Sequence, residues 1–347
     1  MENNIDKRIG YWLLIGAIMV MSMVVIGGIT RLTHSGLSMV DWKPISGTLP
    51  PMNEAEWTAE FENYKSSPEF QKINSHFTLE DFKGIFFWEY FHRLIGRVIG
   101  IVFIVPFLYF LFTKKLENRT LRRNLILIFF LGGLQGLIGW YMVKSGLVNN
   151  PAVSHYRLAL HLSTALLLIC CILWTALSVF YPRINREYSE IRKPLLLLLP
   201  VVAIQIIYGA FVAGLKAGYI FPSYPKMGPN WIAPGIGQAL ESEGFISLIG
   251  NPLTVQFIHR WFAIIVVLLV GYIFIKGKKL ALDQSQQNIN TALISMVGVQ
   301  FLLGVFTLIN AVPVSLGVLH QLGAAILLSI VIIGIYFNSF QIKKAPN

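Results

Sequence analysis

The residues best suited to chemistry are four histidines, each near the start of a long apolar run, two in each half of the chain. A Gly or Ala follows every one of them four residues later. On a helix, this spacing places the small residue about one turn from the imidazole on the same face. Imidazoles ligate haem iron, and ionisable groups inside membrane spans favour a functional role. The pattern predicts haem ligation by His92, His161, His259 and His320.

Glu89 distinguishes the two halves. It precedes His92 by three residues and so shares its helix face, whereas the equivalent residue of the second half is Gln256. A buried carboxyl group can move protons, and a structural salt bridge to Arg93 or Arg157 is the alternative. We interpret Glu89 as catalytic, with chemistry in the first half and a permanent cofactor in the second.

Arginines lie close to the histidines in both halves. A guanidinium group binds carboxylates through two parallel hydrogen bonds, and haem carries two propionates. Extension of the arginines to the membrane interface is the alternative. The candidate propionate-binding residues are Arg93, Arg97, Arg157 and Arg260.

The composition is that of a polytopic membrane protein. Hydrophobic residues make up 55% of the chain, charged residues make up 13%, and the mean hydropathy is +0.62. The net charge of +11 does not indicate nucleic-acid binding, because the basic residues collect in short loops on one side. The adjacent Cys170 and Cys171 lie in an apolar segment, which favours core packing over redox chemistry.

Eight stretches are long and apolar enough to cross a bilayer core of about 30 Å. The basic connections, including Lys343 and Lys344, should face the cytoplasm together with both termini. Two long outer loops, about 31–84 and 216–252, should hold short helices and an irregular Gly- and Pro-rich lid respectively. Thr78–Asp81 resembles a helix start. The predicted spans are 11–30, 85–112, 124–143, 154–180, 195–215, 253–275, 289–310 and 316–338.

The two halves repeat, which predicts an all-α polytopic membrane protein built from two pseudo-twofold-related four-helix bundles. We expect an N-terminal unit (1–194) with a substrate haem site and a C-terminal unit (195–347) with a haem b site. The histidines lie on the second and fourth helix of each unit, within about two turns of the outer end of each span. The matching segments are 24–39 with 206–221, 89–102 with 256–269, 134–140 with 300–306, and 158–168 with 317–327.

One histidine per helix at a single depth argues against a cytochrome that stacks two haems across the bilayer. His155 and His161 are too close in sequence to serve such a pair. A bis-histidine cytochrome b that only transfers electrons and a haem carrier without chemistry are the alternative functions.

Five motifs together resemble the haem A synthase family, in its mitochondrial-type branch, over essentially all eight spans. They are GGITRLTHSGLSMVDWKP (27–44), FWEYFHRLIGR (87–97), VSHYRLALHL (153–162), FIHRW (257–261) and LHQLGAA (319–325). The family often has Glu or Gln in place of His34 and Gln in place of His155, so neither receives a role. Some members also carry a cysteine pair in the first outer loop, which is absent here.

The resemblance implies an oxidoreductase that converts the C8 methyl of haem O to a formyl group by two hydroxylations and loss of water, with water as the oxygen source. The product, haem A, serves terminal oxidases. It implies that His259 and His320 hold haem b, that His92 and His161 bind haem O or haem A, and that Glu89 is the catalytic carboxylate. The expected location is the bacterial cytoplasmic membrane. Haem O synthase, cytochrome oxidase assembly factors and a second copy of the chain are candidate partners.

Overall fold

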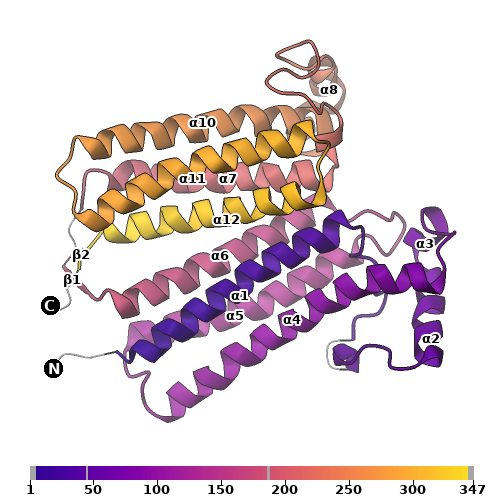
Figure 1. The fold of residues 1–347 in the computed structure, drawn as a ribbon, viewed down its shortest axis with the longest axis horizontal. Helices are drawn as coiled ribbons and strands as arrows, with labels where there is room; N and C mark the ends of the chain where they lie inside the picture. Colours follow the sequence, from indigo (N-terminus) through magenta and orange to yellow (C-terminus); the bar gives the residue numbers. More distant parts are fainter. Residues whose placement is uncertain (1–4, 44–45, 186–187, 343–347) are drawn as a thin grey trace.

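Eight long helices dominate the fold (Figure 1). The computed structural model describes residues 5–43, 46–185 and 188–342. Within these residues, eight helices are long and apolar enough to cross a membrane, which confirms the predicted spans to within a few residues. They are α1 (Lys7–Leu32), α4 (Leu79–Phe112), α5 (Arg119–Lys144), α6 (His155–Phe180), α7 (Arg192–Gly214), α10 (Pro252–Lys278), α11 (Gln284–Ile309) and α12 (Val314–Phe337).

Polar caps extend several helices beyond their apolar spans. Thr78 and Asp81 form a reciprocal capping box, which confirms the helix start expected there. Because α4 begins at Leu79 rather than near residue 85, His92 lies about three and a half turns along it. The other three histidines lie within about two turns of their helix starts.

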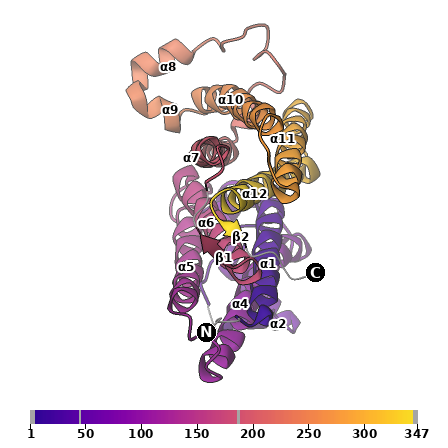
Figure 2. The same ribbon diagram turned by 90° about the vertical axis from the view of Figure 1, so that its left-hand side faces the viewer.

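Each half of the chain forms a closed ring of four helices (Figure 2). In the first half α1 packs on α4 and α6, and α5 packs on α4 and α6. In the second half α7 packs on α10 and α12, and α11 packs on α10 and α12. The rings meet through α1 with α12, α6 with α7, and α6 with α12. The helix order therefore repeats, whereas the division at residue 194 and the twofold relation stay predictions.

The two long loops gather at one end of the helices (Figure 1). The first loop contains the 3₁₀ turn η1 (Ser46–Thr48) and the short helices α2 (Glu54–Lys65) and α3 (Pro68–Lys72), as expected. The expectation of a wholly irregular second loop was wrong. After Gly235, whose φ of 97° suits glycine, the chain forms helix again. This loop contains η2 (Ala217–Tyr219), α8 (Ile236–Glu243), η3 (Gly244–Ile246) and α9 (Ser247–Gly250).

The basic connections lie at the opposite end. There β1 (Arg183–Asn185) pairs antiparallel with β2 (Gln341–Ile342), a short addition to an otherwise helical fold. Figure 1 shows this pair at the same end as the start of α1 and the α4–α5 connection. Lys343 and Lys344 lie outside the described residues.

Candidate functional site

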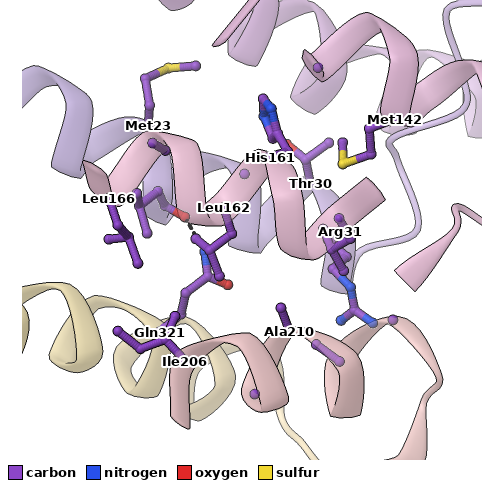
Figure 3. A pocket seen from close by; sticks show the side chains of 18 of the residues that line it. Met23, Thr30, Arg31, Met142, His161, Leu162, Leu166, Ile206, Ala210 and Gln321 are labelled. Atoms are coloured by element: carbon purple, nitrogen blue, oxygen red, sulfur yellow. Dashed lines mark hydrogen bonds between the residues drawn. The ribbon is translucent and has the colours of Figure 1, made fainter. Parts of the chain in front are cut away.

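A single large cavity brings the four predicted histidines together. Its volume is about 1450 Å³, beyond the roughly 300–1,000 Å³ usual for one drug-sized ligand. Figure 3 shows part of its lining, with side chains from both units. Glu89 and the small residues one turn from the histidines also line it: Gly96, Ala165, Ala263 and Ala324.

The ring spacing of the second histidine pair is compatible with two imidazole ligands of one metal ion. The ring centroids of His259 and His320 lie 6.5 Å apart, and the ring planes are nearly perpendicular at 88°. Metal–imidazole bonds of about 2.0 Å place two opposed ring centroids about 6 Å apart. The pair therefore fits an iron atom held between the two rings, as in a bis-histidine haem.

A glycine on a neighbouring helix faces each imidazole. A Cβ atom on any of these glycines would approach the histidine Cε1 atom to between 2.8 and 3.1 Å. Any larger residue would therefore displace the ring. Sequence reasoning found the small residues on the histidines' own helices but missed these partners: Gly27 for His92, Gly139 for His161, Gly209 for His259 and Gly304 for His320.

A glutamine one turn before the glycine holds three of the four histidines. The Gln135 amide donates to the His161 carbonyl at 3.0 Å, with its nitrogen 3.2 Å from Nδ1. Gln205 makes the same two contacts with His259, at the same distances. Gln300 donates to the His320 carbonyl at 2.9 Å. The spacing Gln-x-x-x-Gly occurs three times in the sequence and could have identified these glutamine and glycine partners of the histidines.

These contacts correct one match between the halves. Aligning 134–140 with 300–306 pairs Leu134 with Gln300. The structure instead makes Gln135 equivalent to Gln300, because each bonds the histidine of the next helix. The correct register is shifted by one residue.

Glu89 is buried at the outer end of the first-unit site, with 3% of its surface exposed. Its carboxylate accepts hydrogen bonds from the Ser38 hydroxyl and the Met39 N–H, both at 2.8 Å. It also forms an ion pair with Arg93 at 2.6 Å. The salt bridge weighed from the sequence is therefore present with Arg93, and the carboxylate still lines the cavity.

Arg93 and Arg97 donate hydrogen bonds to backbone carbonyls of the first long loop. Arg93 donates to the carbonyls of Met39 and Asp41, and Arg97 donates to that of Lys43. Both arginines also line the cavity.

Arg260 and Arg157 differ in how they face the cavity. One amino group of Arg260 donates to the carbonyls of Ser223, Pro225 and Lys226. Its other nitrogen, Nη1, is buried without a hydrogen-bond partner among the described residues, and Arg260 lines the cavity. Arg157 lies over the Tyr141 ring at 3.7 Å and is not among the lining residues.

A second buried carboxyl group, Glu69 on α3, also lines the cavity and was missed by sequence reasoning. It is 6% exposed and accepts a hydrogen bond from the Tyr64 hydroxyl at 3.1 Å, to which Asn74 donates in turn. Burial, with a smaller contribution from the charge of Glu89, raises the pKa of Glu69 to about 7. Nothing in the spacing of Glu69 distinguishes it from the exposed acids of the same loop.

The two remaining candidate histidines have different surroundings. His34 lines the cavity in a left-handed turn after α1, with a φ of 54°. His155 lies outside the lining, and its Nε2 atom is 3.0 Å from the Ile249 carbonyl oxygen.

Comparison with known proteins identifies the family of this chain. Residues 10–332 match the family model described as cytochrome oxidase assembly protein. A haem A synthase of Flavobacterium johnsoniae is 47% identical, covering 93% of this chain and 96% of its own length. That of Flavobacterium psychrophilum is 48% identical, over 95% and 97%. The haem A synthase of Saccharomyces cerevisiae is 40% identical, over 93% and 74%. The chain therefore belongs to the cytochrome oxidase assembly protein family, which includes the haem A synthases of bacteria and yeast.

Proposed function

We propose that this chain is a haem A synthase that oxidises the C8 methyl of haem O to a formyl group. The product is haem A for a terminal oxidase. With water as the oxygen source, the conversion removes four electrons and four protons from the methyl group and water together, and an external electron acceptor takes up the electrons. A route of two hydroxylations followed by loss of water satisfies this balance.

The assignment of the two sites rests on the space around each histidine pair, which is larger in the first unit than in the second. Haem O carries a farnesyl tail that haem b lacks. The first unit has glycines on the cavity wall where the second unit has larger side chains at equivalent positions. For three of these glycines a Cβ would meet no atom within 4 Å. The pairs are Gly100 with Val267, Gly132 with Val297, and Gly136 with Phe301.

This difference supports His92 and His161 as the ligands of the substrate haem. It supports His259 and His320 as the ligands of a resident haem b, consistent with their 6.5 Å ring spacing. When bound, the resident haem supplies one-electron redox chemistry.

Glu89 is the proposed catalytic base. Its carboxylate lines the cavity, where it would accept a proton released as the methyl group is oxidised. The Arg93 ion pair orients the carboxylate, and Ser38 offers a hydroxyl next to it. Gln256, the equivalent residue of the second unit, is buried but cannot accept a proton in this way.

The arginines remain proposed contacts of the propionates. Arg260 has the strongest support because its buried Nη1 lacks a partner among the described residues. Arg93 and Arg97 line the outer end of the first site. Arg157 has the weakest support, because it packs on Tyr141 away from the cavity.

We propose a location in the bacterial cytoplasmic membrane, and the positive-inside rule supports both termini in the cytoplasm. Haem O synthase and cytochrome oxidase assembly factors are proposed partners, because haem O and haem A must pass between membrane proteins. A homo-oligomer is compatible with this role.

The direct test of the chemistry is Glu89→Gln, expressed with a haem O supply in cells that lack their own haem A synthase. We expect haem A formation to fall at least about 100-fold, the scale of a lost general base. Chromatography of the extracted haems measures this. The purified variant should keep both haems, because no histidine is changed.

Glu80→Gln is the matched control, since Glu80 is an exposed carboxylate on the same helix, with 83% of its side chain accessible. Normal haem A formation by Glu89→Gln would disprove the catalytic role of Glu89.

A further inference from the structure

In the part of the chain that the structure describes, three of the four histidines accept a hydrogen bond from a glutamine on a neighbouring helix, and the fourth does not. Gln135, Gln205 and Gln300 each donate to the carbonyl of a histidine on the next helix, at 2.9–3.0 Å. Each lies four residues before the glycine that packs against the same ring. One turn of helix therefore supplies both a close contact for the ring and a polar anchor for the histidine. We call this arrangement the glutamine clamp.

His92 lacks this clamp. Gly27 packs against its ring as in the other three cases, but the residue one turn before Gly27 is Met23. A thioether cannot donate a hydrogen bond. Among the described residues, Nδ1 of His92 is buried without a hydrogen-bond partner, as is Nδ1 of His320, so what distinguishes His92 is the lack of a glutamine bound to its carbonyl.

Met23 occupies the position that Gln205 holds in the second unit. The match of 24–39 with 206–221 sets this register, and the shared contacts of Gly27 and Gly209 with a histidine ring support it. Met23 lines the cavity, with its methyl group close to Gly96 on α4. Figure 3 shows Met23 and His161 among the first-unit residues, whereas Ile206, Ala210 and Gln321 come from α7 and α12.

Groups that hydrogen-bond to a metal-bound histidine fix the orientation of its imidazole, and their loss commonly weakens metal binding 10–100-fold. A resident cofactor benefits from two anchored ligands. A substrate haem must instead be released as product in each cycle, which requires at least one ligand that leaves the iron readily.

We infer that Met23 keeps His92 as the exchangeable ligand of the first-unit site, while glutamine clamps hold His161, His259 and His320 in place. This inference rests on the proposed function, because it assigns substrate exchange to that site. Met23 acts through His92 and is therefore a positioning residue. His92 would then be the first ligand to leave the iron when haem is released and the last to bind it when haem enters.

The test measures haem release from the purified full-length protein in detergent to excess apomyoglobin. Haem A, loaded into the first-unit site, is followed separately from protohaem, because its formyl group shifts the absorption bands. We expect Met23→Gln to release haem A at least about 10-fold more slowly than Met23→Leu. Met23→Leu controls for the loss of the thioether without adding a hydrogen-bonding group.

The converse variant removes a clamp from the resident site. Gln205→Met should release protohaem at least about 10-fold faster than the wild type. The Gln205→Met measurement tests the role of the clamp even where Met23→Gln fails to fold. Thermal unfolding of Gln205→Met shows whether faster release of protohaem reflects a general loss of stability.

Equal haem A release by Met23→Gln and Met23→Leu would overturn the inference. Unchanged protohaem release by Gln205→Met would overturn it as well. A wild-type protein that takes up no haem A would overturn the proposed function instead, and the protohaem arm would still decide what the clamp does.

Discussion

The buried carboxyl groups at the outer end of the cavity differ in their partners. Glu89 accepts hydrogen bonds from Ser38, Met39 and Arg93. Glu69 meets only the Tyr64 hydroxyl among the described side chains. Two acids that look alike in sequence therefore have different electrostatic surroundings.

Glu69 should make stability depend on pH. Its folded pKa of about 7 is above the ordinary 4.5, so the folded protein binds more protons between these values. Stability is then full below about pH 4.5 and falls as the pH rises through about 7, by roughly 3 kcal/mol at most. Thermal unfolding in detergent at pH 5 and pH 8 measures the fall, which Glu69→Gln should largely remove.

Glu62→Gln is the control, because Glu62 is an exposed carboxylate of the same loop, with 62% of its side chain accessible. If Glu69→Gln leaves the pH dependence of the wild type intact, the assigned surroundings of Glu69 are wrong.

At the residue scale, the sequence predicted the functional residues that are rare in an apolar membrane span. Histidines and Glu89 stand out within apolar runs, because a membrane span tolerates few such side chains. Glu69 lies in a loop with several other acids, and its burial depends on how α3 packs against the rest of the loop. Local spacing carries no information on that packing.

At the scale of helices, glycines set how closely one helix approaches the histidine of the next. The tightest case is Gly304 on α11, where a Cβ would lie 2.8 Å from His320 Cε1. Helix spans were predictable because hydropathy and caps are local properties. The contacts between helices were not predictable. Glycines occur on several faces of these helices, and only tertiary packing decides which glycine lies against a histidine.

Gly304→Ala should displace the His320 ring and lower the content of resident haem. We expect a loss of about 10-fold in haem affinity, as for other disturbances next to a metal ligand. The pyridine haemochrome spectrum of the purified variant measures bound protohaem. Gly298→Ala is a matched control on the same helix, because a Cβ there meets nothing within 4 Å. Equal protohaem content in the two variants would contradict the packing role of Gly304.

At the scale of the whole molecule, the two four-helix rings share several residue types at equivalent positions but differ in others. Both contain histidines on their second and fourth helices, and both have an arginine that bonds loop carbonyls, Arg93 or Arg260. The first ring adds Glu89, Met23 and a wall of glycines. The repeated helix order was predictable from matching segments. That both rings share one cavity was not, because it depends on how α1, α6, α7 and α12 pack.

The most direct test of this division is the haem content of two purified histidine variants, expressed with a haem O supply. His320→Ala should lose protohaem and keep haem O or haem A, whereas His161→Ala should lose haem O and haem A and keep protohaem. His155→Ala, which changes a histidine outside the cavity lining, is the control and should retain both kinds of haem. Chromatography of the extracted haems separates the three species. Loss of the same haem from both site variants, or the opposite pattern of loss, would contradict a substrate site in the first unit and a resident haem in the second.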